Sequence, residues 1–177
     1  MMVEERRKIS KSESIHNYAL YLRETFELFD DNFDIESFVK DLGGQIRYFN
    51  SFKEKERLVK TGDESFDIYV DSQSLEHYRR FTIAHELGHL FVDFKYPGEK
   101  WKNIDIGEIA KCEGDDLISE EFATEFSCAF LMPKYRFKFI EEKAADTSYP
   151  TQAIAGHFNV PMSLVIWYRK KLEEQSE

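Results

Sequence analysis

Hydrophobic residues recur along the first part of the chain with a helical period. In residues 14–29, apolar side chains lie three and four positions apart, as on one face of an amphipathic helix. The same spacing over residues 35–42 predicts a second helix, which Asp34 caps at its start and Gly43 ends. The chain is therefore expected to begin with two short helices.

The period then shortens to two. Residues 45–49 and 66–70 alternate apolar and polar side chains, which favours half-buried strands. The highly charged segment between them, residues 51–59, is a candidate for a third strand. Because the three segments follow each other closely, we expect the region 43–71 to form a small antiparallel sheet.

The helical period returns for the rest of the chain. A long helix is expected over residues 75–93 and must end before Tyr96-Pro97-Gly98, because proline and glycine both interrupt helices. A loop rich in glycine and charge follows over residues 97–116. Further helices are expected over residues 117–131, 135–143, 151–158 and 162–171. Helices around a small antiparallel sheet indicate the α+β class.

The pattern contains no internal repeat, low-complexity tract or clear linker. We therefore expect a single domain over residues 1–177, with a core over 14–143 and a C-terminal helix pair over 150–173. A hydrophobic fraction of 42% and an aromatic fraction of 15% are sufficient for a core of that size.

The helix expected over residues 75–93 contains the most specific chemical pattern of the chain, a His-Glu-x-x-His motif. His85 and His89 are four residues apart, so their imidazoles project from the same helix face and can bind one zinc ion. Glu86, beside the first histidine, can then act as the general base for a water molecule. The motif predicts a zinc-dependent hydrolase.

A catalytic zinc site usually has three protein ligands. A third histidine six residues after His89 is excluded, because Lys95 occupies that position. The other common solution is a glutamate on a separate helix, and the helix expected over residues 117–131 carries three of them. Spacing alone does not choose among these acids. Our order of preference is Glu120, then Glu121, then Glu125.

Other residues near the motif have expected roles. Thr124 lies four residues after Glu120 and is placed to support the metal helix from behind the ligands. Gly88 has no side chain, so another element can pack closely against the helix that carries the motif. Tyr96 and Tyr135 are candidate donors to the oxyanion that forms during hydrolysis.

Net charge and cysteine content indicate which macromolecular partners and which cellular location to expect. A net charge of −10 disfavours direct binding to nucleic acid and suits a basic protein partner. No apolar run approaches the roughly 20 residues that span a bilayer, so no membrane partner is expected. The charged N-terminal segment lacks the apolar core of a signal peptide, and Cys112 and Cys128 make no disulfide framework. We therefore expect a cytoplasmic protein with reduced thiols.

Three segments resemble the ImmA/IrrE family of metallopeptidases. Residues 80–90, which read RFTIAHELGHL, resemble its zinc-binding signature. Residues 120–133, which end in Leu-Met-Pro, are similar to its second motif, and residues 154–169 to the helix-turn-helix-like tail that follows the peptidase core. The resemblance extends over about residues 15–172, nearly the whole chain.

This resemblance implies a zincin-like minimal metallopeptidase with a gluzincin-like ligand set and one zinc ion per chain. It makes His85, His89 and Glu120 the ligands and Glu86 the catalytic base. It also implies regulatory cleavage of a helix-turn-helix repressor or antitoxin. Two alternatives remain: a catalytically weak module that sequesters a protein partner, and a toxin-like member that acts on another cellular protein.

The chain departs from the family pattern at three positions. Thr124 stands where asparagine is usual, Phe122 where a second acid is common, and Asp93 where many relatives have a histidine. None of these changes removes an expected ligand. They bear on the residues behind the ligands and on substrate preference.

Overall fold

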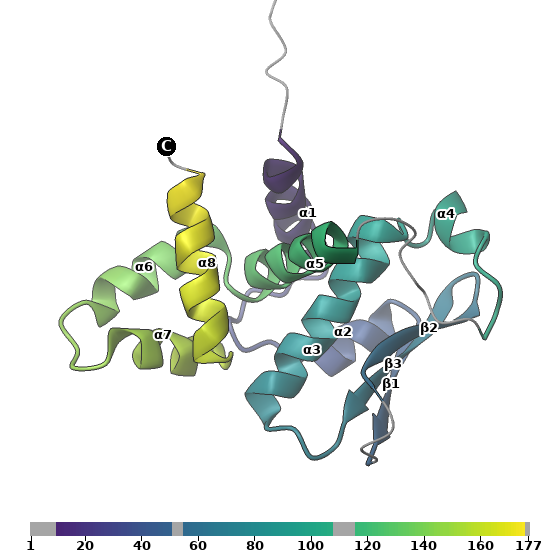
Figure 1. Cartoon of the computed structure of the whole chain (residues 1–177), viewed down its shortest axis with the longest axis horizontal. Helices are drawn as coiled ribbons and strands as arrows, with labels where there is room; N and C mark the ends of the chain where they lie inside the picture. The colour runs from purple at the N-terminus through teal and green to yellow at the C-terminus, as the bar shows by residue number, and fades with distance from the viewer. Residues whose placement is uncertain (1–9, 51–54, 108–115, 176–177) are drawn as a thin grey trace, which may run out of the picture.

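The computed structural model describes residues 10–50, 55–107 and 116–175, arranged as in Figure 1. The elements are α1 (Lys11–Thr25), α2 (Ile35–Asp41), β1 (Gly44–Phe49), β2 (Arg57–Gly62), β3 (Ser65–Asp71), α3 (Glu76–Gly88), the π-helical turn η1 (His89–Asp93), α4 (Glu99–Lys102), α5 (Asp116–Leu131), α6 (Lys134–Ala144), α7 (Pro150–Phe158) and α8 (Met162–Glu174). A three-stranded sheet and eight α-helices within these ranges confirm the α+β class.

The sheet has the strand order β1-β3-β2 and differs from the expected antiparallel arrangement. β2 pairs with β3 in antiparallel register, but β1 runs parallel to β3, from Gly44 opposite Phe66 to Phe49 opposite Asp71. The expectation was therefore wrong for one of the two pairings. β3 is the central, largely buried strand. β2 pairs with one of its edges to form a hairpin, and β1 pairs with the other edge in the same direction as β3.

Local signals in the sequence set the bounds of α2 correctly. Asp34 caps the helix, because its Oδ1 accepts hydrogen bonds from the backbone N–H groups of Glu36 and Ser37 at 3.0 and 3.1 Å. The helix ends before Gly43, whose φ of +88° lies in the left-handed region that favours glycine.

The helix expected over residues 75–93 has two parts. α3 ends at Gly88, and the π-helical turn η1 continues to Asp93 with a hydrogen bond from the Phe94 N–H to the His89 carbonyl. The loop expected over 97–116 contains the short helix α4. Cys112 and the rest of residues 108–115 lie outside the described part of the chain.

α3 lies between the sheet and α5, and α5 in turn packs against α1 (Figure 1). The core between these elements is rich in aromatic side chains, and Phe66, Phe126 and Phe130 have no exposed surface. Cys128 on α5 is also fully buried, and its burial raises the pKa of the thiol. The described helices include none that combines the length and apolarity needed to cross a bilayer.

One carboxylate joins the C-terminal helices to the rest of the fold. Asp31, which precedes α2, accepts hydrogen bonds from Arg136 on α6 and from Nε2 of His157 on α7, the latter at 2.9 Å. The guanidinium of Arg23 on α1 lies 3.9 Å away. These four residues, Asp31, Arg23, Arg136 and His157, are called the Asp31 cluster below.

Candidate metal centre

The candidate metal centre lies where α3 and α5 pack together at close range. A Cβ atom at Gly88 would lie only 2.7 Å from the carbonyl oxygen of Ala123 and 2.8 Å from its Cα atom. The expected role of Gly88 is thereby confirmed, since any side chain there would push α5 away. The close approach allows a side chain of α5 to reach the histidines of α3.

Three of the predicted site residues meet at this crossing. The Nε2 atoms of His85 and His89 are 3.1 Å apart. Oε2 of Glu120 lies 2.9 Å from Nε2 of His85, and Oε1 of Glu120 lies 3.3 Å from Nε2 of His89. Among the described residues, these three form the group of potential metal ligands whose donor atoms all lie within 4.8 Å of one another.

The donor set fits a zinc ion. Ligand atoms about 2.0–2.1 Å from a tetrahedral zinc are roughly 3.3 Å from one another, and the three measured separations lie close to that value. Two imidazole nitrogens and one carboxylate oxygen are a common catalytic ligand set that leaves a fourth position for water or substrate. Glu120 is 58% exposed, so the group also opens to solvent.

Glu86 lies next to this group and is largely shielded from water. Burial raises the pKa of its carboxyl group to about 7, the negative charges of Glu120 and Glu56 add to the effect, and His89 opposes it. A cation on the three ligands would lower that pKa again. Glu86 is therefore an ionisable group beside the three ligands, where an ionised carboxylate can accept a proton.

The two histidines differ in their proton affinity. Burial and the neighbouring His89 lower the pKa of His85. Burial acts in the same direction on His89, but the hydrogen bond to Asp93 and the nearby carboxylates outweigh it and raise the pKa of His89. A proton that enters the pair therefore goes first to His89, and it must leave before the ring can bind a metal.

The other two candidate acids of α5 are engaged elsewhere. Glu121 forms an ion pair with Lys171 on α8 at 2.5 Å. Glu125 is fully buried, accepts a hydrogen bond from Ser12 on α1, and accepts a second from Nε2 of Gln175 at 2.9 Å. Within the described residues, Glu120 is thus the acid of this helix that shares the space of the two histidines.

The second ring nitrogen of each histidine also has a neighbour. Thr124 lies behind His85, as expected, with Oγ1 3.4 Å from Nδ1. Behind His89 is Asp93, whose Oδ2 lies 2.8 Å from Nδ1 and 2.9 Å from Oγ of Ser119. The sequence assigned neither residue a contact with His89, although Asp93 was noted as a departure from the family pattern. The four-residue spacing of His89 and Asp93 was an available signal, whereas Ser119 carried none.

One of the two tyrosines predicted as oxyanion donors is engaged elsewhere in the fold. Tyr96 is buried and donates a hydrogen bond to the carbonyl of Leu42 at 2.6 Å, so that suggestion was wrong. Tyr135 on α6 has Arg23 and Arg136 as its charged neighbours, which places it beside the Asp31 cluster.

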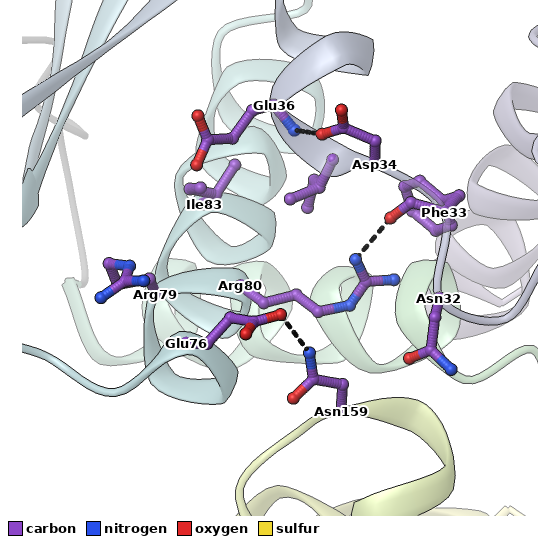
Figure 2. A pocket seen from close by; sticks show the side chains of 10 residues that line it. Asn32, Phe33, Asp34, Glu36, Glu76, Arg79, Arg80, Ile83 and Asn159 are labelled. Atoms are coloured by element: carbon purple, nitrogen blue, oxygen red, sulfur yellow. Dashed lines mark hydrogen bonds between the residues drawn. The ribbon is translucent and has the colours of Figure 1, made fainter.

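A separate cavity of about 290 Å³ lies between the start of α2, the first half of α3 and the α7–α8 turn (Figure 2). Arg80 crosses it and donates hydrogen bonds to the carbonyls of Phe33 and Asp31 at 2.6 and 3.1 Å. Across the cavity, Glu76 accepts a hydrogen bond from Asn159 at 2.8 Å. None of the predicted ligands or the predicted base lines this cavity, so we do not assign the chemistry to it.

Comparison with known proteins supports a metallopeptidase. A peptidase family model, described as the IrrE N-terminal-like domain, matches residues 39–166. The matched range contains the whole sheet, the histidine-bearing helix and Glu120. A search among curated proteins returned no significant match.

Proposed function

The chain belongs to the IrrE N-terminal-like family of metallopeptidases, and from this premise we propose that it is a zinc-dependent endopeptidase of the cytoplasm. We propose further that it cleaves a basic helix-turn-helix repressor or antitoxin and thereby acts as a regulatory switch. The observation that carries the catalytic part of the proposal is the meeting of His85, His89 and Glu120 beside Glu86.

In this proposal each residue has a separate role. His85 and His89 provide neutral ring nitrogens, and Glu120 provides a negatively charged oxygen, so together they would hold one zinc ion. The bound ion would polarise the scissile carbonyl and make a water molecule easier to deprotonate. Glu86 accepts the proton from the attacking water and passes it to the leaving amine.

The nature of the partner is inferred from charge and from the family resemblance. The net charge of −10 gives the chain a negative potential, which raises its encounter rate with a basic protein. DNA-binding repressors carry such basic surfaces, because they must neutralise phosphates. The same charge argues against direct nucleic-acid binding by this chain.

A cleavage assay tests the proposal. The protein is mixed with a purified basic helix-turn-helix repressor, with and without a zinc chelator, and the fragments are resolved by mass spectrometry. We expect fragments that disappear with the chelator and with the variant Glu86→Gln. Binding that persists in chelator without any cleavage would favour a sequestering module instead.

A further inference from the structure

We propose that Asp93 and Ser119 are positioning residues that orient His89 and tie the two ligand-bearing helices together. This inference rests on the proposed function, because it assigns roles around the same metal centre. It goes beyond the family pattern, since Asp93 stands where many relatives have a histidine.

The geometry behind His89 is close and sheltered. The π-helical turn begins at His89 and ends at Asp93, and it places Oδ2 of Asp93 2.8 Å from Nδ1 of the ring. Both side chains are largely buried, at 12% and 14% exposure. A hydrogen bond to a carboxylate in such a place is shorter and stronger than one between neutral groups.

This contact selects one form of the imidazole. A carboxylate can only accept, so Nδ1 of His89 must carry the hydrogen. In the neutral ring, Nε2 is then left with its lone pair, and Nε2 is the atom that faces His85 and Glu120. Asp93 thus presents His89 in the tautomer that a metal ion needs.

Ser119 extends the contact to the second helix. Its hydroxyl donates to Oδ2 of Asp93 at 2.9 Å, and Ser119 itself is buried on α5, directly before Glu120. The two contacts, from His89 to Asp93 and from Asp93 to Ser119, therefore link the end of the histidine-bearing helix to the backbone that carries the third ligand. A shift of α5 would disturb both contacts together.

The other histidine provides an internal comparison. Oγ1 of Thr124 is 3.4 Å from Nδ1 of His85, which is long for a hydrogen bond, and the hydroxyl has no charge. The ring of His85 is therefore held less firmly by its neighbour than the ring of His89. Removing the Thr124 hydroxyl should cost much less metal affinity than removing the Asp93 carboxylate.

Zinc affinity, measured by competition with a chromophoric chelator, tests the proposal. We expect Asp93→Leu to weaken binding roughly 10- to 100-fold, as is typical for the loss of a residue that orients a ligand. Asp93→Asn keeps an acceptor oxygen and should lose less, as should Ser119→Ala, which leaves the contact between Asp93 and His89 in place. Thr124→Val, the matched control behind His85, should change affinity least.

Ring nitrogen chemical shifts add a readout that a merely structural role would not move. In zinc-free protein at alkaline pH, His89 should carry its hydrogen on Nδ1 in the wild type and lose this preference in Asp93→Leu. If Asp93→Leu does not fold, Asp93→Asn and Ser119→Ala still test the order of affinities.

Unchanged affinity across the Asp93 and Ser119 variants would overturn the inference, as would equal losses in Asp93→Leu and Thr124→Val. A wild-type protein that binds no zinc would instead refute the metal centre itself, so the two failures are distinguishable.

Discussion

The metal centre and the Asp31 cluster both gather polar side chains from distant parts of the chain, but their charges are balanced differently. In the Asp31 cluster, a buried carboxylate accepts hydrogen bonds from Arg136 and His157 and lies near Arg23, so the two guanidinium groups of the protein itself neutralise it. In the metal centre, two ring nitrogens and a carboxylate converge on one point. The first arrangement is complete within the fold, whereas the second favours an added cation.

This difference separates structural from chemical roles. A closed cluster contributes to stability, and breaking it should destabilise the fold without any direct effect on chemistry. A converging ligand set contributes to binding and catalysis, and its residues should be replaceable with little loss of fold. The predictions below test this division, from the largest expected effect to the smallest.

The largest effect is expected for Glu86→Gln. Loss of the general base should reduce peptide cleavage by roughly 10²- to 10⁴-fold, while the metal ligands remain in place. Steady-state rates and zinc content, measured on the same preparation, check this. Full activity with zinc retained would rule out Glu86 as the base.

Asp31→Ala should damage the fold instead. Arg136 and His157 would lose their shared acceptor, and the buried Arg23 would lose an ion-pair partner. The expected cost is about 3 kcal/mol in unfolding free energy, the low end of the range for a broken buried pair, because Arg136 and His157 are partly exposed. Urea denaturation measures this. Asp146→Ala, at an exposed site, is the control and should change stability by less than about 0.5 kcal/mol. Equal effects would refute the structural role of the cluster.

Two glycine substitutions should have opposite signs. Gly88→Ala places a methyl group against the backbone of Ala123 and should cost about 1–3 kcal/mol, together with zinc affinity, because α5 must move away. Gly156→Ala on α7 brings the new carbon within 4 Å of no atom outside the adjacent backbone of its own helix, and it should raise stability by up to about 1 kcal/mol through helix propensity. Thermal denaturation compares them, and a neutral Gly88→Ala would contradict the close crossing.

These residues also show what the sequence can and cannot predict. The motif spacing placed His85 and His89 on one helix face, and Gly88 beside them predicted a close neighbour, because both signals are local. Glu120 and Glu121 are adjacent on α5 and project in different directions, so only the angle by which this helix is rotated about its own axis decides which one meets the histidines. That angle depends on contacts between residues far apart in the chain.

The sheet illustrates the same limit. Alternating side chains indicated strands, but the parallel pairing of β1 with β3 depends on the path of the intervening chain around β3. Asp93 lay within reach of local reasoning, since it follows His89 by four residues. Its partner Ser119 comes from the other helix, and no pattern in the sequence marks it.

The smallest expected effect is the loss of the contribution of Asp31 to stability at acidic pH. Burial raises the pKa of Asp31, but hydrogen bonds from Arg136 and His157 outweigh it and hold the pKa below its ordinary value of 3.8. Asp31 therefore stabilises the fold fully above that value, and its contribution fades as pH falls through the lower value of the folded state. The stability gap between wild type and Asp31→Ala, measured in urea, should shrink only below about pH 4. A gap that closes near neutral pH would contradict this assignment.

The proposed chemistry depends most on the three predicted metal ligands, and calorimetric titration of zinc into zinc-free protein tests them directly. Wild-type protein should bind one zinc ion per chain. Glu120→Gln should weaken binding by more than roughly 100-fold, because a lost ligand costs more than a lost supporting residue. Glu121→Gln, at the adjacent position, should leave affinity unchanged. Wild-type affinity in Glu120→Gln, or an equal loss in both variants, would contradict the metal centre described above.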